Sequence, residues 1–256
     1  MKLSWDEAGS RLFETGVSKA VLYPTDSIGN YQKGVAWNGL ISVTVSPEGA
    51  EPTPIYANNV KIAETYSFLD FNGSIDAFTY PDEFSDCIGF EETFSGMRFA
   101  MQKRKRFALV WRSRLGNDID RLEHGYKIHI LYNCMAQLSE MPFSTINEDP
   151  ELINFSWSFS TIPILAPGYL QTSYVEIDST KANPDNMYFL EQVLYGTDWT
   201  DPIIPLPEKL YDVMADREVD WAKAMYAILD NTGYPFNGIY PEYVEGLYPK
   251  YDGRRF

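Results

Sequence analysis

The strongest constraint on the fold is a set of segments in which apolar and polar residues alternate. The clearest is residues 153–160, INFSWSFS, in which every second residue is apolar and the others are Asn or Ser. Successive side chains of a strand point to opposite faces, so this period of two predicts a half-buried strand. Residues 127–133 and 173–178 also alternate, residues 107–112 are a short apolar run that ends in charge, and together these segments indicate a mainly antiparallel β domain.

Two longer strands are predicted at residues 35–45 and 55–68. The segment between them, SPEGAEPTP at residues 46–54, contains three prolines and a glycine. Such a segment cannot continue a sheet ladder or a helix. The sequence therefore predicts a long hairpin with an irregular tip at residues 46–54.

Helix signals are few and lie late in the chain. Asn183 followed by Pro184 is typical of a helix N-terminus, and Gly196 is suited to its C-terminus. A longer helix is predicted from Pro207 to about residue 230, because apolar residues recur there at steps of three and four. Its stripe comprises Leu210, Val213, Met214, Trp221, Ala224, Met225 and Ile228.

The last 23 residues, 234–256, are rich in Tyr, Pro and Gly and contain a short repeat, GIYPEYVE followed by GLYPKYDG. Proline and glycine at these positions exclude a continuous helix. Tyr240, Tyr243, Tyr248 and Tyr251 provide aromatic surface of the kind that anchors interfaces. We expect an extended arm that docks either on another subunit or on its own domain, and the sequence leaves both open.

The search for catalytic or metal-binding residues gives no supported site. His124 and His129 have no Ser or Cys partner suggested by the sequence, and their spacing on a strand points them to opposite faces. Cys87 and Cys134 have no metal-ligand spacing. The acidic residues between Asp82 and Glu92 are interpreted as a solvated loop. We therefore expect no enzyme activity, cofactor or bound metal.

The charge distribution argues against some partners. The formal net charge is −15, which disfavours a protein that grips nucleic acid or an anionic membrane surface. We expect no membrane-spanning helix and no signal peptide, because no apolar run of about 18 residues occurs and the N-terminus, MKLSWDEAG, lacks an apolar core. Seven of the 21 basic residues lie between Met97 and Arg114, where no acid occurs.

An ordered series of segments resembles the major tail protein, or tail tube protein, of long-tailed bacteriophages. The segments are LSWDEAGSRLFETGVSKAVLYP at residues 3–24, KGVAWNGLISV at 33–43, AFTYPDEF at 77–84, QKRKRFALVWRS at 102–113, GND at 116–118 and HGYKIHILYNC at 124–134. The resemblance covers roughly residues 1–200 in the same order. It implies a β-sandwich or partly closed barrel with a flanking α-helix, to which this chain adds a C-terminal helix and an extended arm.

The resemblance also implies how the chain assembles. In that family, six subunits join their sheets into a ring, and rings stack through a long hairpin loop and terminal arms into a tube through which DNA passes. The implied inter-ring loop is Ser46, Pro47, Glu48, Gly49, Ala50, Glu51, Pro52, Thr53 and Pro54. Arm contacts would come from Tyr240, Tyr243, Tyr248 and Tyr251, and intersubunit charge pairing from Lys103, Arg104, Lys105 and Arg106 with Asp82 and Glu83.

The implied location is the virion, after synthesis in the bacterial cytoplasm. The implied partners are further copies of the chain and the tail tape measure, tail terminator and distal tail proteins. We expect a tube domain at residues 1–205 and a C-terminal extension at 206–256. Two alternatives remain open: a carbohydrate-binding β-sandwich module, and a tube subunit of a contractile-injection or secretion system.

Overall fold

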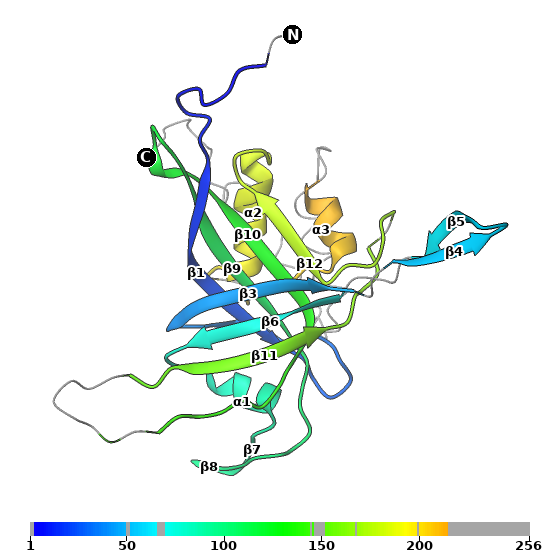
Figure 1. Cartoon of the computed structure of the whole chain (residues 1–256). Helices are drawn as coiled ribbons and strands as arrows, with labels where there is room; N and C mark the ends of the chain where they lie inside the picture. Colours follow the sequence, from blue (N-terminus) through cyan, green and yellow to red (C-terminus); the bar gives the residue numbers. More distant parts are fainter. Residues whose placement is uncertain are drawn as a thin grey trace, which may run out of the picture.

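A computed structural model of the chain describes residues 3–49, 52–65, 70–143, 145, 152–166, 168–198 and 200–214 (Figure 1). The strands are β1 (Phe13–Pro24), β2 (Val35–Ala36), β3 (Leu40–Glu48), β4 (Thr53–Ala57), β5 (Val60–Thr65), β6 (Asp70–Ala77), β7 (Glu91–Phe94), β8 (Met97–Phe99), β9 (Phe107–Asn117), β10 (Arg121–Ala136), β11 (Phe155–Thr161) and β12 (Tyr174–Asp178). The helices are α1 (Asp82–Ile88), α2 (Pro184–Tyr195) and α3 (Pro207–Met214).

The main sheet is antiparallel and is built around the long strand β10. Its order is β2-β1-β9-β10-β11-β6-β3, and β12 also pairs with β10. Residues 127–131 in the middle of β10 pair with β12, and residues 134–136 at its end pair with β11, so the sheet divides along this strand. Asn133, with a φ of 55°, lies at the register shift between these two parts of β10. In Figure 1, β3, β6 and β11 cross in front of β1, β9 and β10, forming two layers.

The sandwich core lies between these two layers. Its largest fully buried side chain is Trp157 of β11, which contacts Phe84 of α1 with ring centroids 5.1 Å apart. Leu22, Leu109 and Leu131 face it from β1, β9 and β10. The alternation at residues 153–160 is confirmed, because Trp157 and Phe159 are buried while the intervening serines lie outside the core.

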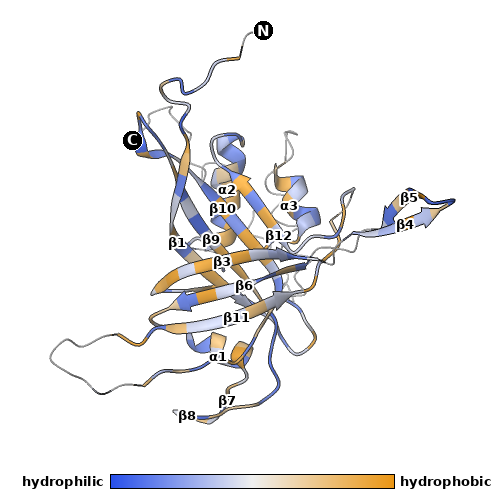
Figure 2. Ribbon diagram, viewed as in Figure 1, coloured by the Kyte–Doolittle hydropathy of each residue, from blue (hydrophilic) through white to orange (hydrophobic). Residues whose placement is uncertain are grey.

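A second core covers the opposite face of β1, β9, β10 and β12. Ile128, Ile130 and Tyr132 of β10 pack there against α2 and α3, as their shared side of the strand predicts. Because both faces of β1 and β9 are buried, residues 20–23 and 107–111 are continuous apolar runs (Figure 2). The fold is thus a mainly β sandwich with flanking helices, and the described strands do not close into a barrel.

The predicted helix ends are confirmed where they are described. The Asn183 side chain accepts a hydrogen bond from the Asp185 N–H at 2.9 Å, and Gly196 ends α2 with a φ of 76°. α3 begins at Pro207 and buries Leu210 and Val213. Trp221 and the rest of the stripe lie outside the described residues, and the predicted domain boundary at residue 205 stays a prediction. No described helix is long and apolar enough to cross a membrane.

Residues 82–88 form α1, so the prediction of a solvated acidic loop is wrong in this part. Asp82 and Glu83 occupy the first turn, where carboxylates favour a helix, and Gly89 ends the helix with a φ of 85°. Phe84, Cys87 and Ile88 are buried against the sandwich core. The acidic side chains face outward because this short helix is amphipathic.

Candidate functional site

The β4–β5 hairpin projects from the sandwich at the right of Figure 1. Nearly all of its residues are exposed, including the apolar residues Tyr56, Val60 and Ile62, which are 61–65% exposed. The tip is Asn58–Asn59, whose φ angles are 52° and 62°. Two residues with positive φ between paired strands form the turn that matches strand twist, and Asn tolerates this conformation.

The predicted tip at residues 46–54 is wrong. Ser46, Pro47 and Glu48 belong to β3 and pair with Asn72, Phe71 and Asp70 of β6. Thr53 and Pro54 begin β4, and Ala50 and Glu51 lie outside the described residues. The prediction failed because proline, which cannot donate a backbone hydrogen bond, is excluded only from central strands. β3 is an edge strand of the sheet, where proline is tolerated. The signal that we missed is the Asn-Asn pair between two apolar, β-branched segments.

Several residues of the predicted intersubunit charge pairing have other partners within the chain. Arg98 Nη2 lies 2.7 Å from Asp82 Oδ1, and Lys105 Nζ lies 2.6 Å from Asp86 Oδ2. Arg104 and Arg106 donate to the carbonyl oxygens of Ala136 and Asn133 at 2.9 and 3.0 Å. These groups thus have partners within one copy of the chain. The predicted pairing of Lys103, Arg104, Lys105 and Arg106 with Asp82 and Glu83 of another subunit stays a prediction. The arm residues Tyr240, Tyr243, Tyr248 and Tyr251 fall outside the described part of the chain.

Sequence reasoning also missed a row of polar side chains across four neighbouring strands. We call this set the polar row: Glu14 from β1, Ser113 from β9, Lys127 and His129 from β10, and Tyr174 and Glu176 from β12. Lys127 lies opposite Ser113, and His129 lies opposite Glu176, so strand register brings the row together. Lys127 Nζ is 2.9 Å from a carboxylate oxygen of both Glu14 and Glu176.

His129 is the buried centre of the polar row. Its ring stacks on Trp111, with centroids 5.0 Å apart, and is only 5% exposed. Ser113 Oγ donates to Glu14 Oε1 at 2.6 Å and also lies 2.7 Å from His129 Nε2. Since the serine's single proton goes to Glu14, Nε2 carries the imidazole proton, and Nδ1 accepts a hydrogen bond from the Tyr174 hydroxyl at 2.6 Å.

This arrangement differs from a hydrolytic site. A catalytic histidine removes the proton from its serine, and the serine must reach a substrate. Here the imidazole donates to Ser113, which is 5% exposed in the middle of β9. His124 takes no part, because its Nδ1 contacts Asn117 and Asp120 instead.

The polar row also contains a donor set that could hold a metal ion: Glu14, His129 and Glu176, whose ligand atoms lie within 4.8 Å of one another. However, the Lys127 ammonium lies between the two carboxylates, where it supplies the positive charge that a metal ion would bring. The carboxylates flank different nitrogens of His129, since Glu14 lies near Nε2 and Glu176 near Nδ1. We therefore interpret the polar row as a network that joins four strands.

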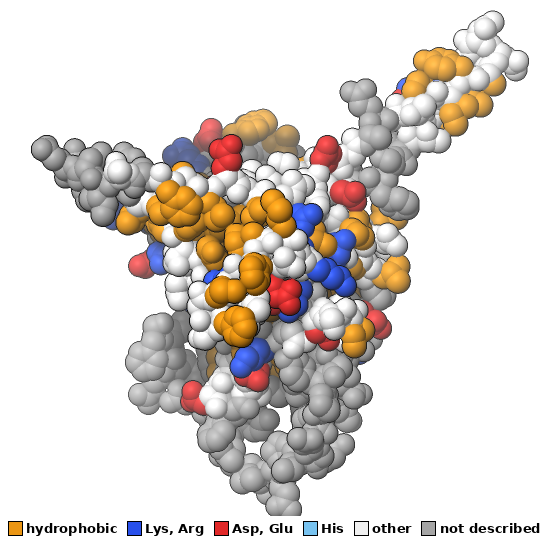
Figure 3. Space-filling model, turned by 90° about the horizontal axis from the view of Figure 1, so that it is seen from below, with side chains coloured by type: hydrophobic (Ala, Val, Ile, Leu, Met, Phe, Trp, Pro, Cys, Tyr) orange, Lys and Arg blue, Asp and Glu red, His pale blue; other side chains and the backbone are white. Residues whose placement is uncertain are grey.

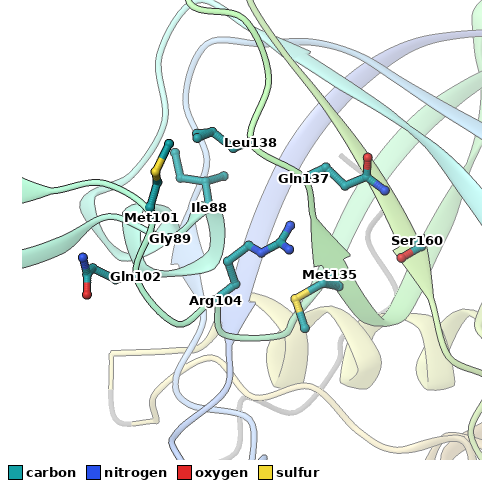
Figure 4. Close-up of a pocket in the computed structure, with 9 residues that line it drawn as sticks. All are labelled: Ile88, Gly89, Met101, Gln102, Arg104, Met135, Gln137, Leu138 and Ser160. Atoms are coloured by element: carbon teal, nitrogen blue, oxygen red, sulfur yellow. The ribbon is translucent and has the colours of Figure 1, made fainter.

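The end of the molecule that carries α1, β7 and β8 presents a second kind of surface. Hydrophobic side chains gather there beside Lys and Arg (Figure 3). A pocket of about 550 Å³ opens between α1, the segment before β9, and the ends of β10 and β11. Ile88, Met101 and Leu138 lie on one side of it and Gln137 and Ser160 on the other, with Arg104 between them (Figure 4). The described lining residues include no carboxylate, thiol or imidazole, so they offer no acid–base pair.

No model of a known protein family matches the chain, and no curated protein matches it. Among solved structures, the chain is similar to a chain in the 6-fold symmetrised cryo-EM structure of the anti-feeding prophage (AFP) baseplate. The match has 7% sequence identity and a TM-score of 0.27, and it covers 70% of this chain and 99% of that chain. A match of this strength carries no conclusion about the function of this chain.

Proposed function

We propose that the chain is a structural subunit of a bacteriophage tail tube, which assembles as hexameric rings that stack around a lumen. The ordered sequence resemblance over roughly residues 1–200 supports this proposal, and the mainly β sandwich with flanking helices agrees with the fold that it implies. The observation that carries the proposal in the structure is the projecting β4–β5 hairpin.

A two-stranded hairpin alone in water is marginally stable. This one exposes Ile55, Tyr56, Val60 and Ile62. Exposed apolar side chains gathered on one element favour contact with another protein. In a tube, a second copy of the chain supplies that contact, and a heterologous contact between copies closes into a ring or extends a stack. The hairpin therefore replaces residues 46–54 as our proposed inter-ring element.

The net charge of −15 supports the passage of DNA through such a lumen. Carboxylates along the wall repel phosphates and offer no cations to replace the counterions of DNA. Under this proposal the chain performs no catalysis, is located in the virion, and contacts the tail tape measure, tail terminator and distal tail proteins.

Electron microscopy of the purified chain at increasing concentration tests the proposal. We expect rings or tubes from the wild type, and loss of tubes in Tyr56→Ser with an unchanged melting temperature of the subunit. Tyr188→Ser is the matched control, because Tyr188 of α2 is 67% exposed and Tyr56 is 65% exposed. A chain that stays monomeric at every concentration, and that is absent from isolated tails, contradicts the proposal.

A further inference from the structure

An apolar groove of about 530 Å³ runs between α3 and the edge strand β12. It is lined by Tyr211 and Met214 of α3, by Tyr169 and Leu170 before β12, and by Val175 and Ile177 of β12, and Ile177 also belongs to the second core. Glu176, Asp178 and Lys181 add charged groups to the lining. The groove therefore borders the second core and leaves part of it uncovered.

Three residues of this lining expose large apolar side chains to water. Tyr169 is 73% exposed, Leu170 79% and Tyr211 51%. The rings of Tyr169 and Tyr211 contact each other at one place in this lining, with centroids 6.3 Å apart. Apolar side chains gathered around a concave surface favour an apolar occupant.

An apolar segment of the same chain, residues 215–229, follows directly after the groove residue Met214. Met214 of α3 is the last residue that the structure describes and also lines the groove, and 42 residues follow it in the sequence. Residues 215–229 read ADREVDWAKAMYAIL, in which Trp221, Met225 and Ile228 recur at steps of four and three. We propose that this segment turns back after Met214 and fills the groove with these three side chains.

Covalent connection favours the segment of the same chain over that of a neighbour. Six residues separate Met214 from Trp221, and an extended span of that length reaches about 20 Å. Because this linker is short, the effective concentration of the segment at the groove is high. The segment also extends the second core, since it would cover Ile177 beside Leu210. This assignment does not depend on the chain being a tail subunit.

Cross-linking tests the proposal in the full chain. We expect Leu170→Cys combined with Met225→Cys to give mainly an intramolecular product with a short bismaleimide. The native Cys87 and Cys134 are buried, and burial raises the pKa of both thiols, so they stay unreactive. The control pair is Ile28→Cys with Met225→Cys, since Ile28 is 85% exposed in the loop between β1 and β2. Equal yields from both pairs, or mainly dimeric product, overturn the proposal.

Trypsin cleavage after Arg217 and Lys223 gives a second readout. In the folded chain we expect slow cleavage at these sites, at least tenfold faster cleavage in Leu170→Asp, and unchanged cleavage in Leu165→Asp. Leu165 is the matched control because it is 76% exposed but is not among the lining residues of the groove. If the wild type is cleaved as fast as Leu170→Asp, the segment is not docked. If Leu170→Asp is cleaved as slowly as the wild type, the segment docks elsewhere. Either outcome contradicts the assignment.

Discussion

At the scale of single residues, the polar row places one ammonium between two carboxylates on one face of the sheet. The Lys127 ammonium contacts the carboxylates of Glu14 and Glu176, which are 34% and 40% exposed at their side chains. His129 lies 3.1 Å from Glu14 and 3.9 Å from Glu176 by its ring nitrogens, and its ring stacks on Trp111. Burial, which disfavours the charged imidazolium, lowers the pKa of His129 below its ordinary value. The carboxylates of Glu14 and Glu176 act to raise that pKa, and the Lys127 ammonium, which offsets one of their two charges, acts with burial to lower it.

Stability should therefore fall in acid in two stages. The unfolded chain protonates a histidine below about pH 6.5, whereas the folded chain resists protonation of His129, so acid lowers the free energy of unfolding. Burial acts to raise the pKa of Glu14, but hydrogen bonds from Ser113 and Lys127 lower it on balance. Protonation of Glu14 thus lowers the free energy of unfolding further below about pH 4.3. We expect His129→Gln to remove the first stage in thermal melts.

His124→Gln is the control for this measurement, since His124 lies outside the polar row. Each 1 kcal/mol lost should lower the melting temperature by about 2–4 °C in a protein of this size. A wild type whose melting temperature is constant between pH 7.5 and 5.5 would show that His129 is not held neutral by the fold.

Lys127→Met tests the bridging role of the ammonium. The substitution leaves Glu14 and Glu176 as like charges without the cation between them. Because hydrogen bonds to charged groups contribute about 1.5–3 kcal/mol, and these carboxylates are partly exposed, we expect a loss near the lower end of that range in urea unfolding. Adding Glu176→Gln should restore part of the loss, whereas Asp178→Gln, on the same strand, should not.

At the scale of secondary-structure elements, the β4–β5 hairpin and α1 are stabilised in different ways. The hairpin depends on its Asn58–Asn59 turn, whereas α1 depends on the burial of Phe84, Cys87 and Ile88. The hairpin can therefore change without disturbing the sandwich, but α1 cannot, because it covers one end of the sandwich core.

Asn59→Val should open the hairpin selectively. A β-branched residue at positive φ costs about 1–2 kcal/mol, so the hairpin amides should exchange hydrogen faster. The melting temperature of the whole chain should change little, because the hairpin residues are exposed. Asn59→Gly is the control and should keep or slow the exchange, since glycine adopts positive φ freely. A global loss of stability in Asn59→Val would mean that the hairpin packs on the sandwich.

At the scale of the whole molecule, two cores share the same three strands. Leu22, Leu109 and Leu131 face the sandwich core, while Val21, Val110 and Ile130 face the second core from the neighbouring positions. Loss of either core therefore withdraws packing from β1, β9 and β10 together. We infer that the described part of the chain unfolds as one cooperative unit.

Two core substitutions test this coupling. We expect Trp157→Ala to lower stability by about 3–5 kcal/mol and Leu190→Ala, in α2, by about 2–5 kcal/mol. Each variant should still unfold in one transition, with the same midpoint by near-UV and far-UV circular dichroism. Leu165→Ala, at an exposed site, should change stability by about 0.5 kcal/mol or less. Separate transitions in either variant would show that the two cores fold independently.

The sequence by itself determined the elements whose signals are local. The period of two at residues 153–160 and the Asn183–Pro184 helix start specify backbone conformation through neighbouring residues alone. The mainly β class follows from several such segments. α1 was missed because seven residues are too short to show a clear helical period, although Phe84, Cys87 and Ile88 share its buried face.

Only the tertiary structure decided which strands pair and which side chains meet. β3 pairs with β6 rather than with the segment that follows it, so the expected hairpin at residues 46–54 became the end of an edge strand and its connection to β4. Ser113, His129 and Glu14 meet because three strands align, although Glu14 lies 99 positions before Ser113. Strand pairing depends on the burial of side chains over the whole sheet, and a local sequence pattern does not contain that information.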